Sequence, residues 1–374
     1  MIRRQIFQSI KDNLFRQKAI IIYGPRQSGK TTLIEMLRKS VESKILLLDG
    51  DEPDTRHKLT NVTSSQLKTL FSGYEIVMID EAQRIENIGI TIKLIIDKIK
   101  NVQLIATGSS SFELANKIME PLTGRKLEFY LYPVSVSEMV LYHGEEEEKR
   151  QLENRLLYGM YPEVVTKPEN VLQTLKSITS SYLYKDILTF RDLRRPEMLN
   201  QLLEALALQL GSEVSFHELA QIVRADPVTI ERYIYMLEQA FVIFRLRALS
   251  RNVRNELKKR RKIYFIDNGV RNALIANFST MNLRTDKGAL WENFMVSERF
   301  KLLKYRNMFV NPWFWRTTQQ QEIDYVEEKD GRFSAFEFKW SPRKLARIPK
   351  TFRMAYPDYS FETVSPENYL QFLK

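Results

Sequence analysis

The sequence predicts an α/β protein that begins with a parallel-sheet domain and continues with a helical region and a smaller α/β domain. Three observations indicate this. An apolar run at 19–23 leads into a glycine-rich loop and then a helical run. A second apolar run, at 76–79, ends in two carboxylates. Near the C-terminus, two alternating stretches at 322–326 and 333–339 flank Asp330-Gly331, a strong hairpin-turn signal.

Length and composition narrow the class of protein. The 374 residues suggest two or three domains. No cysteine occurs, which excludes disulfides and thiolate metal sites and favours a reducing compartment. No apolar run approaches the roughly 18 residues of a membrane span. The basic start at residues 1–4 is not followed by the apolar core of a signal peptide. We therefore expect a cytoplasmic protein with no membrane partner.

The net charge of +11 is unevenly distributed. Residues 1–150 carry 22 Lys and Arg against 20 Asp and Glu, whereas residues 151–374 carry 35 against 26. A basic C-terminal half favours a nucleic-acid partner, because Lys and Arg neutralise phosphates. Solubility alone is the alternative explanation.

The loop at residues 24–31 has the form G-x-x-x-x-G-K-[ST], the pattern of a phosphate-binding loop (P-loop). It consists of Gly24, Pro25, Arg26, Gln27, Ser28, Gly29, Lys30 and Thr31, with Thr32 opening the following helix. The two glycines allow a tight turn that points backbone N–H groups at phosphates. Lys30 is expected to reach the β- and γ-phosphates of ATP, and Thr31 to ligate Mg²⁺. The flanking strand and helix disfavour a chance glycine-rich turn.

The expected strands after the P-loop carry the next site residues. Residues 45–48 are all apolar, so we expect a strand buried on both faces. The run at 76–79 ends at Asp80 and Glu81. About fifty residues after a P-loop, such an Asp is expected to hold Mg²⁺ and the Glu to orient the attacking water.

Two further candidates lie beyond the expected strand at 102–107. Ser109 or Thr107 is placed to sense the γ-phosphate from the tip of that strand, although a serine helix cap is an equal alternative. Arg125 is a candidate arginine finger, acting in cis or in trans. A surface salt bridge is at least as good an explanation for Arg125.

These motifs, GPRQSGKT, IVMIDEAQ, IATGSSS and LTGRKLEFYLYPVS, resemble those of the AAA+-related ATPases of bacteria and archaea known as ATP-binding proteins. The resemblance covers almost the whole chain. It implies a P-loop domain joined to a winged helix and a PD-(D/E)XK nuclease-like fold. It also implies that Lys30, Thr31, Asp80 and Glu81 carry ATP and Mg²⁺.

The expected domain boundaries follow composition and helix signals. We expect an ATPase domain at 1–145, a helical linker at 146–195, a winged helix at 196–250 and a nuclease-like domain at 251–374. The winged helix rests on three expected helices followed by a strand. Its third helix would present Thr229, Arg232 and Tyr233 to a nucleic-acid groove, although a structural role is slightly favoured because only one cation is present.

The segment from Arg251 to Lys262 holds seven cations against one Glu. Such a segment can neutralise several phosphates and bind DNA or RNA without sequence preference. A solvated hairpin is the alternative.

Four residues near the C-terminus resemble the PD-(D/E)XK phosphodiesterase site: Glu292, Asp324, Glu337 and Lys339. Alternation puts Glu337 and Lys339 on one face of a strand. Asp324 and Glu337 could then share a metal ion, with Glu292 as a further ligand and Lys339 orienting water. Solvated charges on a strand are the alternative, and whether this site cleaves nucleic acid is left open.

The sequence therefore predicts a Mg²⁺-dependent ATPase coupled to a C-terminal region that acts on nucleic acid. The alternative is a nucleotide-gated switch, similar to the STAND proteins, that binds a protein partner and has an inactive nuclease-like fold. Whether Arg125 acts in trans, which needs a homo-oligomer, is left open.

Overall fold

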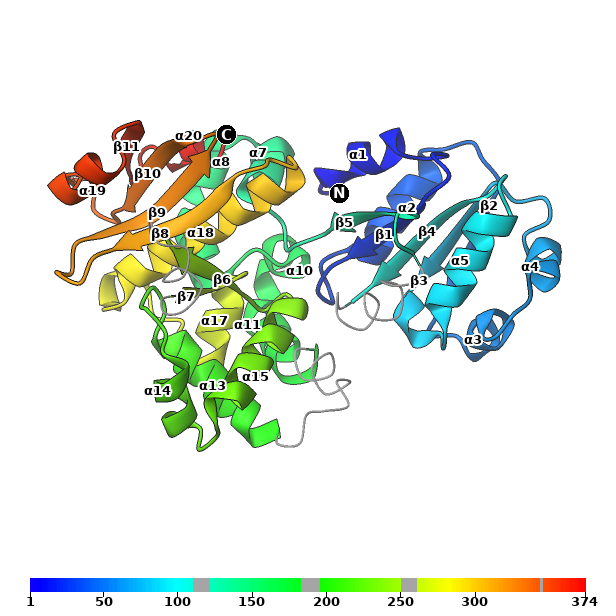
Figure 1. Cartoon of the computed structure of the whole chain (residues 1–374), viewed down its shortest axis with the longest axis horizontal. Helices are drawn as coiled ribbons and strands as arrows, with labels where there is room; N and C mark the ends of the chain where they lie inside the picture. The colour runs from blue at the N-terminus through cyan, green and yellow to red at the C-terminus, as the bar shows by residue number, and fades with distance from the viewer. Residues whose placement is uncertain (110–121, 183–195, 250–260, 344–345) are drawn as a thin grey trace. The chain divides into compact units, whose positions relative to one another are not determined.

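The computed structural model describes residues 1–109, 122–182, 196–249, 261–343 and 346–374. The chain divides into two compact units, one built from residues 1–134 and the other from most of the chain after Val134 (Figure 1). Among the described residues, no helix is both long and apolar enough to cross a bilayer.

The first unit contains a five-stranded parallel sheet in the order β2-β3-β4-β1-β5. The strands are β1 (Ala19–Tyr23), β2 (Ile45–Asp49), β3 (Ile76–Asp80), β4 (Gln103–Gly108) and β5 (Lys126–Tyr130). Every residue of β1, β3 and β4 is buried, as expected for parallel strands covered on both faces. The predicted parallel sheet is confirmed.

The expectation that the run at 45–48 is buried on both faces is wrong. Strand β2 is an edge strand with β3 as its sheet neighbour, and Leu47 is 43% exposed. Of its four leucine and isoleucine residues, Leu48 alone is fully buried. An apolar run cannot by itself distinguish a central strand from an edge strand.

The first unit also contains helices, of which α1 contacts β5 and α5 contacts β4 (Figure 1). They are α1 (Ile6–Asp12), α2 (Lys30–Lys39), α3 (Pro53–Leu59), α4 (Ser64–Leu70) and α5 (Ile88–Lys98), with a 3₁₀ turn η1 (Ala82–Arg84). Helix α1 buries Ile6, Phe7 and Ile10.

The second unit begins with short helices and continues with a three-helix segment. The first group is α7 (Val136–His143), α8 (Glu145–Arg150), α9 (Leu152–Tyr158), α10 (Pro162–Thr166), η2 (Pro168–Asn170), α11 (Val171–Ser177) and η3 (Ile178–Tyr182). The second group is α13 (Pro196–Leu208), α14 (Phe216–Ile222) and α15 (Pro227–Gln239). The Ser215 side chain caps α14, and Pro227 is the first residue of α15.

A six-stranded mixed sheet completes this unit, in the order β11-β10-β9-β8-β6-β7. The strands are β6 (Ile243–Ala248), β7 (Arg261–Phe265), β8 (Asn311–Arg316), β9 (Glu322–Lys329), β10 (Arg332–Phe338) and β11 (Tyr359–Val364). The helices are α17 (Asn268–Leu274), η4 (Met281–Leu283), α18 (Lys287–Tyr305), α19 (Lys350–Ala355) and α20 (Tyr369–Phe372). Long helix α18 runs along the sheet (Figure 1).

The predicted β9–β10 hairpin is confirmed. The strands pair antiparallel with Arg332 opposite Lys329. The two turn residues, Asp330 and Gly331, have φ values of 51° and 81°, as a two-residue primed turn requires. This register brings Asp324 of β9 beside the end of β10, where the Phe338 N–H donates to Asp324 Oδ2 over 2.8 Å.

The sheet crosses the boundary expected at 250. Strand β6 pairs antiparallel with β7 and parallel with β8, so strands from both sides of that position share one set of hydrogen bonds. The boundary expected at 145 falls inside the second unit, which starts at Ser135. The composition of a polar segment does not show that the strands before and after it pair in one sheet.

Candidate functional site

The P-loop joins β1 to α2 in the first unit, in the predicted order of strand, loop and helix. A Cβ atom on Gly24 would lie 2.2 Å from the Leu131 carbonyl oxygen, so the loop needs glycine there. Gly29, with φ of 94°, turns the chain into α2. Pro25 and Ser28 are buried, whereas Arg26 and Gln27 are partly exposed.

The Lys30 side chain lies inside the loop. Its Nζ donates to the carbonyl oxygens of Gly24 and Pro25, each over 3.0 Å, and the residue is 5% exposed. The ammonium is thus held by neutral acceptors, which phosphate oxygens can replace with stronger, charge-assisted bonds. Thr32 follows as an exposed residue in the first turn of α2.

The Asp80 carboxylate, at the end of β3, accepts hydrogen bonds from two threonine hydroxyl groups. Thr31 Oγ1 donates to Asp80 Oδ2 over 2.8 Å, and the Thr107 hydroxyl donates to Asp80 Oδ1. Thr31 and Asp80 therefore present two neighbouring oxygens, which is the kind of ligand that Mg²⁺ takes in phosphoryl-transfer sites. The site residues Thr31 and Asp80 lie together, as the sequence predicts.

Glu81 lies directly beyond the strand in a left-handed conformation, with φ of 48° and ψ of 41°. Its backbone N–H donates to Thr107 Oγ1, and its carboxylate accepts from Gln83 Nε2 over 2.6 Å. Burial raises the pKa of Glu81, while the Lys30 charge, at 4.0 Å, opposes that rise. Backbone strain of this kind is common at functional sites.

Ser109 and Glu81 are linked by hydrogen bonds to the same side chain, that of Gln83. Gln83 Nε2 donates to both Glu81 Oε2 and Ser109 Oγ, the latter over 3.0 Å. Of the two predicted sensor residues, Thr107 contacts Asp80 directly and Ser109 is linked to Glu81 through Gln83. No motif in the sequence indicates a role for Gln83.

Arg4 contacts the P-loop and was also missed. This buried side chain donates from Nη1 to the Ser28 carbonyl and from Nη2 to the Tyr132 carbonyl, each over 2.6 Å. It ties one turn of the P-loop to the chain beyond β5. Only the basic start of the sequence hints at this contact, because nothing in the local pattern connects residues so far apart.

A second cluster of charged groups lies in the second unit, at the ends of β7, β9 and β10 and on α18. It brings together all four residues of the predicted E…D…E-x-K set. Lys339 Nζ lies 2.6 Å from Glu337 Oε2 and 3.8 Å from Asp324 Oδ2. Asp324 and Glu337 are within hydrogen-bonding reach of each other, and Glu292 interacts electrostatically with Asp324. The structure therefore places these four side chains near one another.

Three residues of this cluster were not predicted: Lys262, Tyr264 and Glu322. Lys262 Nζ lies 2.9 Å from Glu292 Oε1 and 2.5 Å from Glu322 Oε1. The Tyr264 hydroxyl donates to Glu292 Oε1 over 2.6 Å. Lys262 looked like the last cation of a solvated basic segment, so its burial at 1% exposure could not be read from composition.

The environment shifts the pKa values of this cluster. Burial raises the pKa of Glu292 to about 7, although the Lys262 charge opposes the rise. Burial and then the Asp324 charge raise the pKa of Glu337 to about 7. Burial lowers the pKa of Lys262, but the charges of Glu292, Asp324 and Glu322 outweigh it and leave the pKa raised. Lys262 is therefore an ammonium at neutral pH.

Comparison with known proteins divides the chain into three segments. Residues 16–140 match a family model described as an AAA domain. The match covers most of the first unit and includes its P-loop, and we call this unit the AAA-type domain below. Residues 149–281 and 287–369 match two models that are each described as a domain of unknown function.

Relatives align along most of the chain. "Uncharacterized protein Rv2008c" of Mycobacterium tuberculosis is 25% identical over 341 residues, covering 90% of this chain and 74% of the relative. "Uncharacterized protein MJ1544" of Methanocaldococcus jannaschii is 23% identical over 347 residues, covering 86% and 74%. Among solved structures, the Walker-type ATPase PABY2304 of Pyrococcus abyssi aligns with a TM-score of 0.48 and 15% identity, over 74% of this chain and 96% of that one.

Arg125 lies at the opposite end of the AAA-type domain's sheet from the P-loop. It precedes β5, whose Lys126 pairs with Ala19 at the start of β1, whereas the P-loop follows Tyr23 at the end of β1. Five strand residues span roughly 16 Å. Arg125 instead pairs with Asp97 over 2.8 Å. A cis arginine finger at Arg125 is therefore a wrong expectation for this arrangement, and a trans role stays a prediction.

The metal site expected at Asp324 and Glu337 does not fit the residues around it. Ammonium groups already contact Glu292, Glu322 and Glu337 directly. Within the described ranges, no group of three or more Asp, Glu, His or Cys side chains is arranged to hold a metal ion. A metal-bound role for these carboxylates stays a prediction that this geometry does not support.

Helix α15 presents a different surface from the one expected for groove binding. Tyr233 is 3% exposed and belongs to the core, so it cannot contact a base. Thr229 donates to the Asp226 carboxylate at the start of the helix. Exposed positions on α15 include Arg232 and the large side chains Val228 and Tyr235. The basic residues 251–260 lie outside the described residues.

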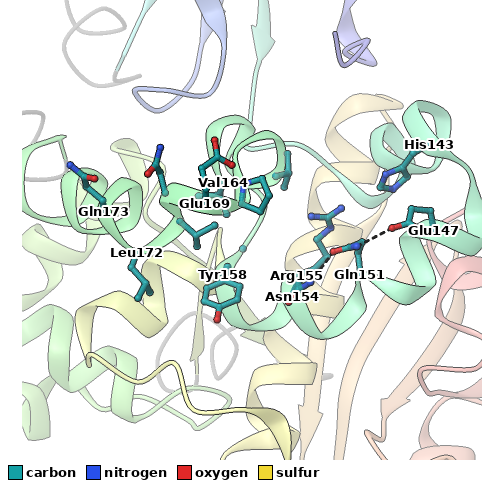
Figure 2. Close-up of a pocket in the computed structure, with 15 residues that line it drawn as sticks. His143, Glu147, Gln151, Asn154, Arg155, Tyr158, Val164, Glu169, Leu172 and Gln173 are labelled. Atoms are coloured by element: carbon teal, nitrogen blue, oxygen red, sulfur yellow. Dashed lines mark hydrogen bonds between the residues drawn. The ribbon is translucent and has the colours of Figure 1, made fainter.

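The helices at the start of the second unit enclose a cavity of about 820 Å³ (Figure 2). Arg155, at its wall, is paired with buried Glu148, whose carboxylate also accepts from His143 Nε2 over 2.9 Å. Glu147, Gln151 and Tyr158 line it further (Figure 2). This cavity could not be predicted from the sequence, because its lining residues show no motif spacing.

Replacing Arg4 by alanine tests the contact beneath the P-loop. We expect Arg4→Ala to weaken ATP binding about 10-fold, because charge-assisted hydrogen bonds to two carbonyls are lost and the loop is less well held. Arg4→Lys should recover part of the affinity. Titration with a fluorescent ATP analogue measures this. The exposed neighbour Arg3 provides the control as Arg3→Ala, and equal affinities of all variants would contradict the role.

Proposed function

We propose that the protein binds ATP with Mg²⁺ at the P-loop and hydrolyses it. The arrangement of Lys30, Thr31 and Asp80 supports this most directly, because one ammonium group and two metal-type oxygens meet at the end of a Gly-rich loop. The match of residues 16–140 to an AAA domain supports it independently.

Each residue has a distinct role in this proposal. Lys30 exchanges its two carbonyl acceptors for phosphate oxygens and neutralises charge that develops during phosphoryl transfer. Thr31 and Asp80 would hold Mg²⁺, which would supply positive charge to neutralise the phosphates. Glu81 orients the attacking water and accepts its proton, and burial raises its pKa toward the value that a base needs at neutral pH.

We further propose that the nucleotide state acts on the C-terminal half, which contacts DNA or RNA. The surplus of cations after residue 150 supports this partner. A protein-binding switch is the second candidate. It is favoured by α15, where Val228 is 76% exposed and Tyr235 is 43% exposed, because apolar and aromatic side chains of this kind suit a protein surface.

Salt dependence separates these partners. If the basic segment neutralises about four phosphates, affinity for a DNA duplex should fall roughly 100-fold between 50 and 200 mM salt. DNA should also stimulate ATP turnover. Fluorescence anisotropy and a phosphate-release assay measure these two effects.

Charge reversal locates the contact. The double variant Lys258→Glu/Lys259→Glu should weaken DNA binding and flatten the salt slope. The double variant Lys304→Glu/Lys329→Glu makes the same charge change at two exposed positions elsewhere and should retain binding. Salt-independent or absent binding, with no stimulation of ATP turnover, would favour the protein-binding switch.

A further inference from the structure

The carboxylate cluster of the second unit is built around a lysine. Lys262 extends from β7 and is 1% exposed. Its Nζ contacts Glu292 of α18 and Glu322 of β9, at 2.9 and 2.5 Å, and is attracted electrostatically by Asp324. The ammonium therefore joins three elements that are distant in sequence. Lys339 closes the other side of the cluster against Glu337.

Four carboxylates in this space require positive charge. Asp324 and Glu337 lie next to Tyr325 and Phe336, which pair with each other across β9 and β10, and their like charges repel. Buried carboxylates without compensation are costly, and proteins supply either a metal ion or a paired cation. Here the two lysines supply it, because each ammonium lies at hydrogen-bonding distance from at least one carboxylate.

The position of Lys262 is fixed. Its backbone belongs to β7 and pairs with Leu246 of β6. Its ammonium lies 5.5 Å from the centre of the Phe314 ring, and Tyr264, from the same strand, bonds the same Glu292 oxygen. An ammonium enclosed in this way cannot leave without unpacking the strand, so a divalent ion would have to displace a buried charge of the same sign.

We propose that Lys262 permanently provides the cation of this cluster, so that the second unit binds no divalent metal ion there. The carboxylates then serve to position β7, β9 and α18 around the ammonium. The proposal goes beyond ATP hydrolysis, which uses residues of the other unit and is unaffected by it. It also gives a physical reason why the nuclease-like residue set does not by itself predict cleavage.

Manganese binding tests the proposal without an activity assay. All proteins carry Asp80→Asn and are free of nucleotide, so that the P-loop contributes little metal binding. Electron paramagnetic resonance should then detect no saturable Mn²⁺ site up to about 1 mM, the weak end of protein cation sites. A Mn²⁺ site in this parent protein that disappears on adding Asp324→Asn would overturn the proposal.

Replacing Lys262 by methionine should create the missing metal site. Lys262→Met keeps a long side chain but removes the charge, so we expect it to gain Mn²⁺ binding and a thermal midpoint raised by roughly 5 °C when the ion is present. Lys301→Met is the matched control, because Lys301 is equally buried at 1% exposure but pairs with Glu298. It should show no Mn²⁺ effect.

Two remaining outcomes also test the proposal about Lys262. A folded Lys262→Met variant that takes up no Mn²⁺ would overturn the proposal, since Lys262 would not then be what excludes the ion. If Lys262→Met does not fold, the titration of the parent protein with and without Asp324→Asn still gives the answer.

Discussion

Lys30→Ala is expected to reduce ATP turnover by on the order of 10²–10³-fold. Lys30 is the single buried ammonium among the described P-loop residues, and its Nζ lies 3.0 Å from the carbonyl oxygens of Gly24 and Pro25. Its loss removes the charge that stabilises the transferred phosphoryl group. A coupled-enzyme assay of turnover and an equilibrium titration of ATP separate effects on catalysis from effects on binding.

The control for this change lies on the same helix. Lys39 is exposed at the end of α2, so Lys39→Ala removes the same charge from the same element without touching the loop. It should retain full turnover. Wild-type turnover in a folded Lys30→Ala variant, judged by circular dichroism, would show that the loop does not cradle a triphosphate.

Gly159→Ala is expected to destabilise the second unit by about 4 kcal/mol. Gly159 ends α9 with φ of 77° and ψ of −161°, a conformation that is essentially restricted to glycine. A Cβ atom there would lie 2.1 Å from Asp267 Oδ1. Because the Asp267 carboxylate accepts from the N–H groups of Met160 and Val270, its displacement would leave two buried donors without a partner.

Gly144→Ala isolates the backbone part of this effect. Gly144 has a similar conformation, with φ of 92° and ψ of 161°, but a Cβ there meets no atom within 4 Å. It should cost about 2 kcal/mol from strain alone. Equal losses for the two variants would mean that Asp267 accommodates the methyl group.

Tryptophan fluorescence during urea unfolding reports on the second unit, which contains Gly144 and Gly159. All four tryptophans belong to the second unit: Trp291, Trp313, Trp315 and Trp340. The unfolding midpoint measured in this way is therefore insensitive to changes confined to the AAA-type domain.

The sequence was informative wherever chemistry depends on local spacing. The P-loop needs glycines, a lysine and a threonine within eight residues, so its strand, loop and helix could be located from the sequence. The turn at Asp330-Gly331 is similarly local, and it fixed the register that brings Asp324 to Glu337. Because β1 and β3 run parallel in one sheet, both end at the same edge of the sheet, which places Asp80 near Thr31.

Contacts between distant segments could not be predicted in this way. Arg4 reaches Ser28 and Tyr132, and Lys262 reaches Glu292 and Glu322, with no motif that relates these positions. Burial was equally hard to judge. Leu47 and Lys262 were assigned the wrong environments because one belonged to an apolar run and the other to a basic one, whereas sheet position decides exposure.

The shared sheet has a consequence for how this architecture can change over generations. Family matches divide the chain between residues 281 and 287, yet Lys262 lies before that division and Glu292, Glu322 and Asp324 lie after it. Exchanging one segment for that of an unrelated lineage would leave either an ammonium or several carboxylates without counter-charge inside the fold. The two segments should therefore be inherited as a pair, and recombination between them should survive only when both halves of the charge cluster come from compatible parents.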